Sequence, residues 1–228
     1  MKRPFLAAGF IGIAVIVMSI ILMGVYPPRS PSLPTGFFTP IIAFEFIDSP
    51  EEVYRLFGEK NSPERQEMVR AMDWGNRLDF IYMLLYSLFL FFFSKQCSRE
   101  TGNKIFYLGA VMSIVVLTGD FMENLQLLKI TSTLDEGTFE GELMALKIFT
   151  WQKWAGIATI FFILIPYFIR GKVFAKIIAF WGCGVCFTGV MACLERSIVN
   201  EIFSLSVAVM FLLMIVYSFI VTSDMRRV

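Results

Sequence analysis

Six runs of apolar residues, each about 20 residues long, constrain this chain more than any other feature of its sequence. About 20 apolar residues in a helix reach across the hydrocarbon core of a bilayer. Inside lipid only helices and closed barrels satisfy every backbone polar group, and runs of this length favour the helix. We therefore predict an all-α, polytopic integral membrane protein, a bundle of about six transmembrane helices in a single domain, residues 1–228. The expected spans are about 5–25, 76–94, 105–128, 145–169, 173–194 and 197–221.

The composition agrees with this class and excludes several others. Charged residues make up only 17% of the chain, whereas soluble domains have about 25%. The net charge of +1 provides no basic field for a nucleic acid. The chain has no histidine, which removes the commonest general base and metal ligand. We expect no metal and no cofactor, and we expect the lipid bilayer, not a nucleic acid, as the partner.

The stretch between the first two runs, residues 26–75, is polar and carries three signals for helix starts. Thr39-Pro40 places a proline at a first helical position, and Ser49-Pro50-Glu51-Glu52 has the pattern of a capping box. Ser62-Pro63-Glu64 starts a third helix, which we expect to run outside the membrane before it enters the second span. We therefore predict a helical extracytoplasmic segment between the first and second transmembrane helices.

The positions of lysine and arginine predict the orientation. Ten of these cations lie at the two termini and in or next to the loops after the second and fourth runs, with only two acids. Because cytoplasmic loops are rich in lysine and arginine, we expect a plasma membrane protein with both termini in the cytoplasm. The first run is longer than the roughly 7–15 apolar residues of a signal peptide, so we expect it to remain as the first span.

The third run contains three polar side chains that are costly in lipid. Asp120, Glu123 and Asn124 have the spacing i, i+3 and i+4, so they share one face of a helix. Ionisable residues within membrane helices face the protein interior or a water-filled cavity. This face therefore indicates a site inside the bundle.

The predicted topology brings further polar residues to the same depth, the extracytoplasmic third of the membrane. The candidate binding residues are Asp79, Asp120, Glu123, Asn124, Lys153, Trp154 and Glu201. Acids outnumber bases at this level, which favours a cationic or polyhydroxylated ligand, with Lys153 available for an anionic group. The aromatic-rich segment 37–57 is a candidate lid. Glu45 in its first helix either reaches the cavity or, as we favour, lies on a solvated face of that helix.

Three functions remain open. In the first, which we favour, the outward-facing cavity binds or transports a small polar or amphiphilic molecule; the chain shows no inverted repeat, so a homo-oligomer would complete a transport path. In the second, an intramembrane enzyme uses Asp120 and Glu123 as acid and base on a lipid or isoprenoid, with other catalytic residues unassigned. In the third, a structural or assembly subunit pairs these acids with Lys153, and Glu201 with Arg196, to fix helix packing.

Overall fold

The structure is a computed structural model that describes residues 3–137 and 139–222. Within these residues the chain forms eight α-helices and no strand. Two are short, α2 (Pro40–Glu45) and α3 (Pro50–Phe57). The other six are long and apolar enough to cross a membrane: α1 (Leu6–Val25), α4 (Pro63–Thr101), α5 (Phe106–Ser132), α6 (Glu140–Ile169), α7 (Val173–Leu194) and α8 (Ile198–Ile220). The predicted all-helical class is confirmed, and the six long apolar helices agree with the predicted multi-pass membrane protein.

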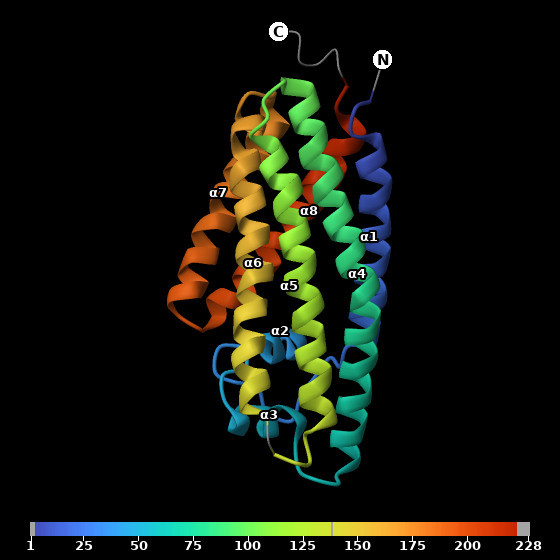
Figure 1. The fold of residues 1–228 in the computed structure, drawn as a ribbon, viewed down its shortest axis with the longest axis vertical. Coiled ribbons are helices and arrows are strands. Elements are labelled where there is room, and N and C mark those ends of the chain that lie inside the picture. The colour runs from blue at the N-terminus through green and yellow to red at the C-terminus, as the bar shows by residue number, and fades with distance from the viewer. Residues whose placement is uncertain (1–2, 138, 223–228) are drawn as a thin grey trace.

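The six long helices form a closed ring. Going round it, α1 packs on α4, α4 on α5, α5 on α6, α6 on α7 and α7 on α8, which returns to α1. Helix α1 begins and α8 ends at the same end of the bundle, and α2 and α3 lie toward the opposite end (Figure 1). We call the end with α2 and α3 the distal end. Many large apolar side chains on the outside of the long helices, such as Phe162 and Phe180, are exposed, as expected of a surface that faces lipid.

Helix α4 is the longest element, with 39 residues. The side chain of Ser62 accepts a hydrogen bond from the backbone N–H of Arg65, and Pro63 opens the first turn. At 1.5 Å per residue the helix is about 58 Å long, roughly twice the hydrocarbon core. Its first turns therefore extend beyond the other spans at the distal end. It ends at Gly102, whose φ of 71° is the left-handed conformation typical of a helix C-cap.

A close contact fixes the distal end of α1 against α4. A Cβ atom at Gly75 would lie 2.2 Å from Cε1 of Tyr26, so this position has room only for glycine. The Tyr26 hydroxyl then donates a hydrogen bond to Oδ1 of the buried Asn76, at 3.1 Å. Beyond this contact the chain leaves the bundle and leads to α2.

The interior of the bundle differs between its two halves. Toward the end opposite the distal one it is aromatic: the ring of Phe5 lies 4.7 Å from that of Phe93 and 5.8 Å from that of Tyr167, measured between centroids. Toward the distal end the interior holds ionisable side chains instead, among them the buried Asp120 and Lys153. The interior of the bundle is therefore polar toward the distal end and apolar toward the opposite end.

Candidate functional site

Lys153 of α6 lies at the centre of a buried group of carboxylates. Its Nζ is 3.1 Å from Oε2 of Glu45 and 3.5 Å from Oδ1 of Asp120, and it also forms an ion pair with Glu123. The exposed fraction is 6% for Lys153, 2% for Asp120 and 0% for Glu123. Helices α2, α5 and α6 thus meet at one ammonium group.

Helix α4 joins this group through α5. The Asn124 amide donates a hydrogen bond to Oδ2 of Asp79, at 2.6 Å, and lies 3.5 Å from Oδ1 of Asp120. Tyr86 follows Asp79 on α4 by about two helical turns. Its hydroxyl donates to Oδ2 of Asp120. Both oxygens of Asp120 are therefore occupied, one by Tyr86 and the other by Lys153 and Asn124.

Helix α6 supplies further partners on both sides of Lys153. The Thr150 hydroxyl donates to Oε1 of Glu123, at 2.6 Å, and the Trp154 indole N–H donates to Oε2 of Glu45, at 2.9 Å. The Lys153 ammonium also lies 5.2 Å from the centre of the Trp154 ring, within the range of a cation–π contact. Burial raises the pKa of Glu45, and the Lys153 ammonium opposes that shift. We call the whole group the polar cluster: Glu45, Asp79, Tyr86, Asp120, Glu123, Asn124, Thr150, Lys153 and Trp154.

The polar cluster contains more acids than bases. Three carboxyl groups, those of Glu45, Asp120 and Glu123, contact the single ammonium of Lys153, and a fourth, that of Asp79, joins them through Asn124. An unpaired carboxylate is costly to bury because it loses its hydration in a medium of low dielectric constant. The cluster therefore favours added positive charge, either as protons or as a cationic group.

Glu201, a predicted site residue, lies outside the polar cluster. Its Oε1 accepts hydrogen bonds from the backbone N–H groups of Phe38 and Thr39, at 3.0 and 2.8 Å, and its Oε2 accepts from the Thr39 hydroxyl, at 2.7 Å. These N–H groups precede α2, where a helix start leaves donors without partners. Glu201 thus fastens the beginning of α2 to α8.

Arg196, in the turn before α8, binds a later part of the same segment. Its guanidinium donates to both carboxylate oxygens of Glu52, at 2.9 and 2.6 Å, and its Nε donates to the carbonyl of Phe46. The sequence interpretation that paired Arg196 with Glu201 is wrong in this respect, because Arg196 pairs with Glu52 and Glu201 binds the donors that precede α2. Segment 37–57 is therefore held at its start and again at Phe46 and Glu52.

A cavity of about 190 Å³ adjoins the polar cluster. Glu45, Thr150, Trp151 and Asn200 are among the residues that line it. Asn200 is fully buried; its Oδ1 accepts a hydrogen bond from the backbone N–H of Ser197, at 2.9 Å, but its Nδ2 has no partner in the described part of the chain. The cavity thus combines contact with the cluster and a buried donor that lacks an acceptor.

The structure brings six of the seven predicted site residues together and leaves Glu201 aside. The six in the polar cluster are Asp79, Asp120, Glu123, Asn124, Lys153 and Trp154. Whether they bind a ligand stays a prediction. Sequence reasoning missed Tyr86 and Thr150, whose residue types carry no distinctive signal. For Glu45 it favoured a solvated face over a place at the cavity, whereas Glu45 lines the cavity and pairs with Lys153. A lone carboxylate within the apolar run 41–47 was the available signal for Glu45.

Comparisons with known protein families, with curated proteins and with solved structures find no match to this chain. The function is therefore argued from the geometry of the site.

Proposed function

We propose that this chain is a multi-pass protein of the plasma membrane that binds a small polar or amphiphilic molecule at its distal end. The observation that carries the proposal is the cavity beside the polar cluster, which is lined by Asn200, whose buried Nδ2 has no acceptor among the described residues. A buried donor without a partner costs about 1–3 kcal/mol. A ligand that accepts a hydrogen bond from Asn200 removes this cost, and it therefore binds more tightly.

The charges around the cavity define the chemistry of this ligand. The ion pairs Lys147–Asp48 and Arg196–Glu52 on its rim are internally balanced, whereas the cluster behind Glu45 holds four acids and one base. A molecule with an amine or several hydroxyl groups suits such a site, provided that it also offers an acceptor to Asn200. The aromatic side chain of Trp151 supplies an apolar wall for an amphiphilic ligand.

The orientation is part of the proposal. The termini and the two loops at the same end carry ten of the 20 lysines and arginines but only two of the 19 acids, and this local excess of cations supports a cytoplasmic location for that end. The distal end then faces the outside of the cell, and residues 26–75 form its extracytoplasmic cover. A ligand would reach the cavity from outside without crossing the apolar half of the bundle.

Binding at the cavity would be transmitted to the cluster through α2. Glu45 is the last residue of α2, lines the cavity and contacts Lys153, so a ligand that displaces α2 also changes the pairing of Lys153. Thr150 gives a second connection, since it lines the same cavity and donates to Glu123. The binding function is preferred over an intramembrane enzyme because Asp120 and Glu123, the acid and base of that alternative, do not line this cavity.

Native mass spectrometry of the detergent-purified protein tests the proposal, with Asn200→Asp as the informative variant. Asp keeps the oxygen that accepts from Ser197 N–H and removes the NH₂ donor. Asn103→Asp is a matched control, because the exposed Asn103 also uses its Oδ1 as an acceptor, from the backbone N–H of Ile105.

We expect the wild type and the control to retain a small molecule that dissociates on unfolding. Asn200→Asp should retain it at lower occupancy, because a lost hydrogen bond of about 1 kcal/mol or more weakens the affinity at least about fivefold. Equal retention by Asn200→Asp and the control, or a wild type that carries only detergent and bulk lipid, would count against the binding function.

A further inference from the structure

The cavity beside the polar cluster offers an open acceptor in addition to the unpaired donor of Asn200. Glu45 lines this cavity, and its side chain is 11% exposed. Its Oε2 lies 3.1 Å from the Lys153 ammonium and accepts a hydrogen bond from the Trp154 indole, at 2.9 Å. Its Oε1 is not fully enclosed and accepts no hydrogen bond from residues 3–137 and 139–222. One carboxylate oxygen is therefore open to a donor in the cavity.

The charges around Glu45 favour a cationic donor over a neutral one. Glu45, Asp120 and Glu123 share the ammonium of Lys153, and no other lysine or arginine of the described chain forms an ion pair with them. A hydroxyl group at Oε1 would make a hydrogen bond but leave the excess of negative charge in place. A protonated amine supplies both the hydrogen bond and the missing positive charge. The open oxygen of Glu45 therefore selects an amine.

The two unmatched groups belong to different walls of the cavity and need opposite partners. Glu45 is the last residue of α2 and needs a donor, whereas Asn200 lies in the first turn of α8 and needs an acceptor. At about 190 Å³ the cavity is smaller than the roughly 300–1,000 Å³ that drug-sized ligands occupy. It therefore suits a small polar group that carries an amine at one end and an acceptor at the other.

The end of α7 connects the cavity to the lipid. Ala192, Cys193 and Leu194, the last three residues of α7, line the cavity, and Leu194 is 76% exposed. With 22 residues α7 is about 33 Å long, close to the thickness of the hydrocarbon core, so its last residues lie near the level of the lipid headgroups. The cavity thus reaches the apolar surface of the bundle at the depth where headgroups lie.

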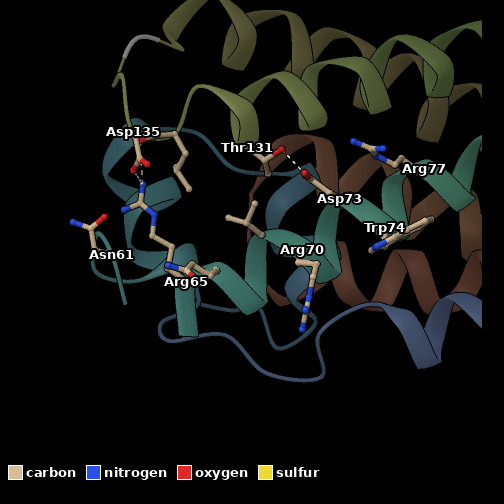
Figure 2. A pocket seen from close by; sticks show the side chains of 11 residues that line it. Asn61, Arg65, Arg70, Asp73, Trp74, Arg77, Thr131 and Asp135 are labelled. Atoms are coloured by element: carbon tan, nitrogen blue, oxygen red, sulfur yellow. Dashed lines mark hydrogen bonds and ion pairs between the residues drawn. The ribbon is translucent and has the colours of Figure 1, made fainter. Parts of the chain in front are cut away.

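A larger cavity at the distal end, of about 500 Å³ between the first turns of α4 and the end of α5, lacks buried unmatched groups. There Arg65 donates to Oδ1 of Asp135, at 2.8 Å, and the Thr131 hydroxyl donates to Asp73, at 2.6 Å (Figure 2). Among the described residues, none of the buried side-chain nitrogen and oxygen atoms without a partner lines this cavity. The unmatched groups are therefore a property of the cavity beside the polar cluster and not of the distal end in general.

We propose that the cavity beside the polar cluster binds the headgroup of an amphiphile that carries a protonated primary amine, such as an ethanolamine phospholipid. The amine donates to Oε1 of Glu45, a phosphate oxygen accepts from Nδ2 of Asn200, and the acyl chains pass Leu194 into the bilayer. This inference rests on the binding function proposed above and names the chemical class of its ligand.

The test uses delipidated protein in detergent and measures binding by native mass spectrometry. The probes are dioctanoyl-phosphatidylethanolamine, dioctanoyl-phosphatidylcholine, dioctanoyl-phosphatidylglycerol and free phosphoethanolamine. Phosphatidylcholine has the same phosphate and the same positive charge as phosphatidylethanolamine, but its methylated nitrogen has no N–H to donate. Phosphatidylglycerol carries hydroxyl groups in place of the amine.

Two carboxylate variants locate the amine. In Glu45→Gln the side-chain oxygen stays at the donors Lys153 and Trp154, so an NH₂ group replaces the open acceptor. Asp48→Asn is the matched control, because Asp48 also lines the cavity but is exposed and pairs with Lys147. The comparison of the lipids on the wild type decides the inference even if a variant fails to fold.

We expect wild type and Asp48→Asn to bind phosphatidylethanolamine at least about tenfold more tightly than phosphatidylcholine or phosphatidylglycerol, since only its amine donates to a charged acceptor. In Glu45→Gln the affinities for phosphatidylethanolamine and phosphatidylcholine should lie within about threefold of each other. Free phosphoethanolamine should bind more weakly than the lipid, because it leaves the rim at Leu194 uncovered.

Equal binding of phosphatidylethanolamine and phosphatidylcholine to the wild type would overturn the amine. A preference that is lost in Asp48→Asn and kept in Glu45→Gln would overturn its place at Glu45. Phosphoethanolamine bound as tightly as the lipid would overturn the amphiphile. If the wild type binds none of these probes but retains a small molecule that Asn200→Asp releases, this inference fails while the binding function stands.

Discussion

Replacing Lys153 with methionine tests the arrangement of the polar cluster. Methionine keeps most of the buried aliphatic stem but removes the ammonium that contacts Glu45, Asp120 and Glu123. Removing one partner of a buried ion pair costs about 3–5 kcal/mol, because the other charge is left without compensation. In a chain of 228 residues, 1 kcal/mol shifts the melting temperature by about 2–4 °C. We therefore expect Lys153→Met to lower Tm by roughly 6–20 °C.

The control is Lys147→Met on the same helix. Lys147 pairs with Asp48 at 3.2 Å, but the two side chains are 66% and 56% exposed, and solvent screens such a pair. An exposed pair contributes about 0.2–1 kcal/mol, so Tm should fall by less than about 4 °C. The fluorescence of the four tryptophans during heating in detergent reports both transitions.

A double variant separates charge from packing. Adding Glu123→Gln to Lys153→Met removes one of the uncompensated carboxylates, so the double variant should be more stable than Lys153→Met alone. If Lys153→Met lowers Tm by no more than Lys147→Met does, the polar cluster is not the buried charge network that its geometry indicates.

Two further substitutions test contacts outside the cluster. Arg196→Gln removes the two-bond pairing with Glu52 and should release segment 37–57, which limited proteolysis will show as faster cleavage; unchanged cleavage would mean that other contacts hold the segment. Gly75→Ala places a Cβ atom 2.2 Å from the Tyr26 ring and should cost about 1–3 kcal/mol in thermal unfolding. Adding Tyr26→Leu should restore part of that stability, and its failure to do so would contradict the packing explanation.

The long helices follow directly from the sequence because their length and apolarity are local properties. The starts of α3 and α4 were also predictable, since Ser49 and Ser62 each accept a hydrogen bond from the backbone N–H three residues later, as their spacing indicates. The end of α4 was not, because the helix continues beyond the expected membrane boundary near residue 94 to Thr101, where the left-handed Gly102 stops it.

The candidate site was predictable only as far as helix periodicity reaches. The spacing of Asp120, Glu123 and Asn124 placed them on one face, and the direction of each span gave the depth at which Asp79 and Lys153 join them. The way in which individual side chains pair depends on contacts between distant segments. Glu45, for instance, reaches Lys153 across more than 100 residues of sequence, and no local pattern specifies such a pair.

Whether the distal end holds a small molecule is decided by the retention of that molecule in carboxylate variants. Asp120→Asn and Glu123→Gln keep the shape of each side chain and remove its charge. We predict that native mass spectrometry will show both variants folded but without the small molecule that the wild type retains, because each change alters the pairing of Lys153 and with it the position of Glu45, which lines the cavity. If both variants instead aggregate, and Lys153→Met restores their folding, the polar cluster serves only to fix helix packing and the claim is contradicted.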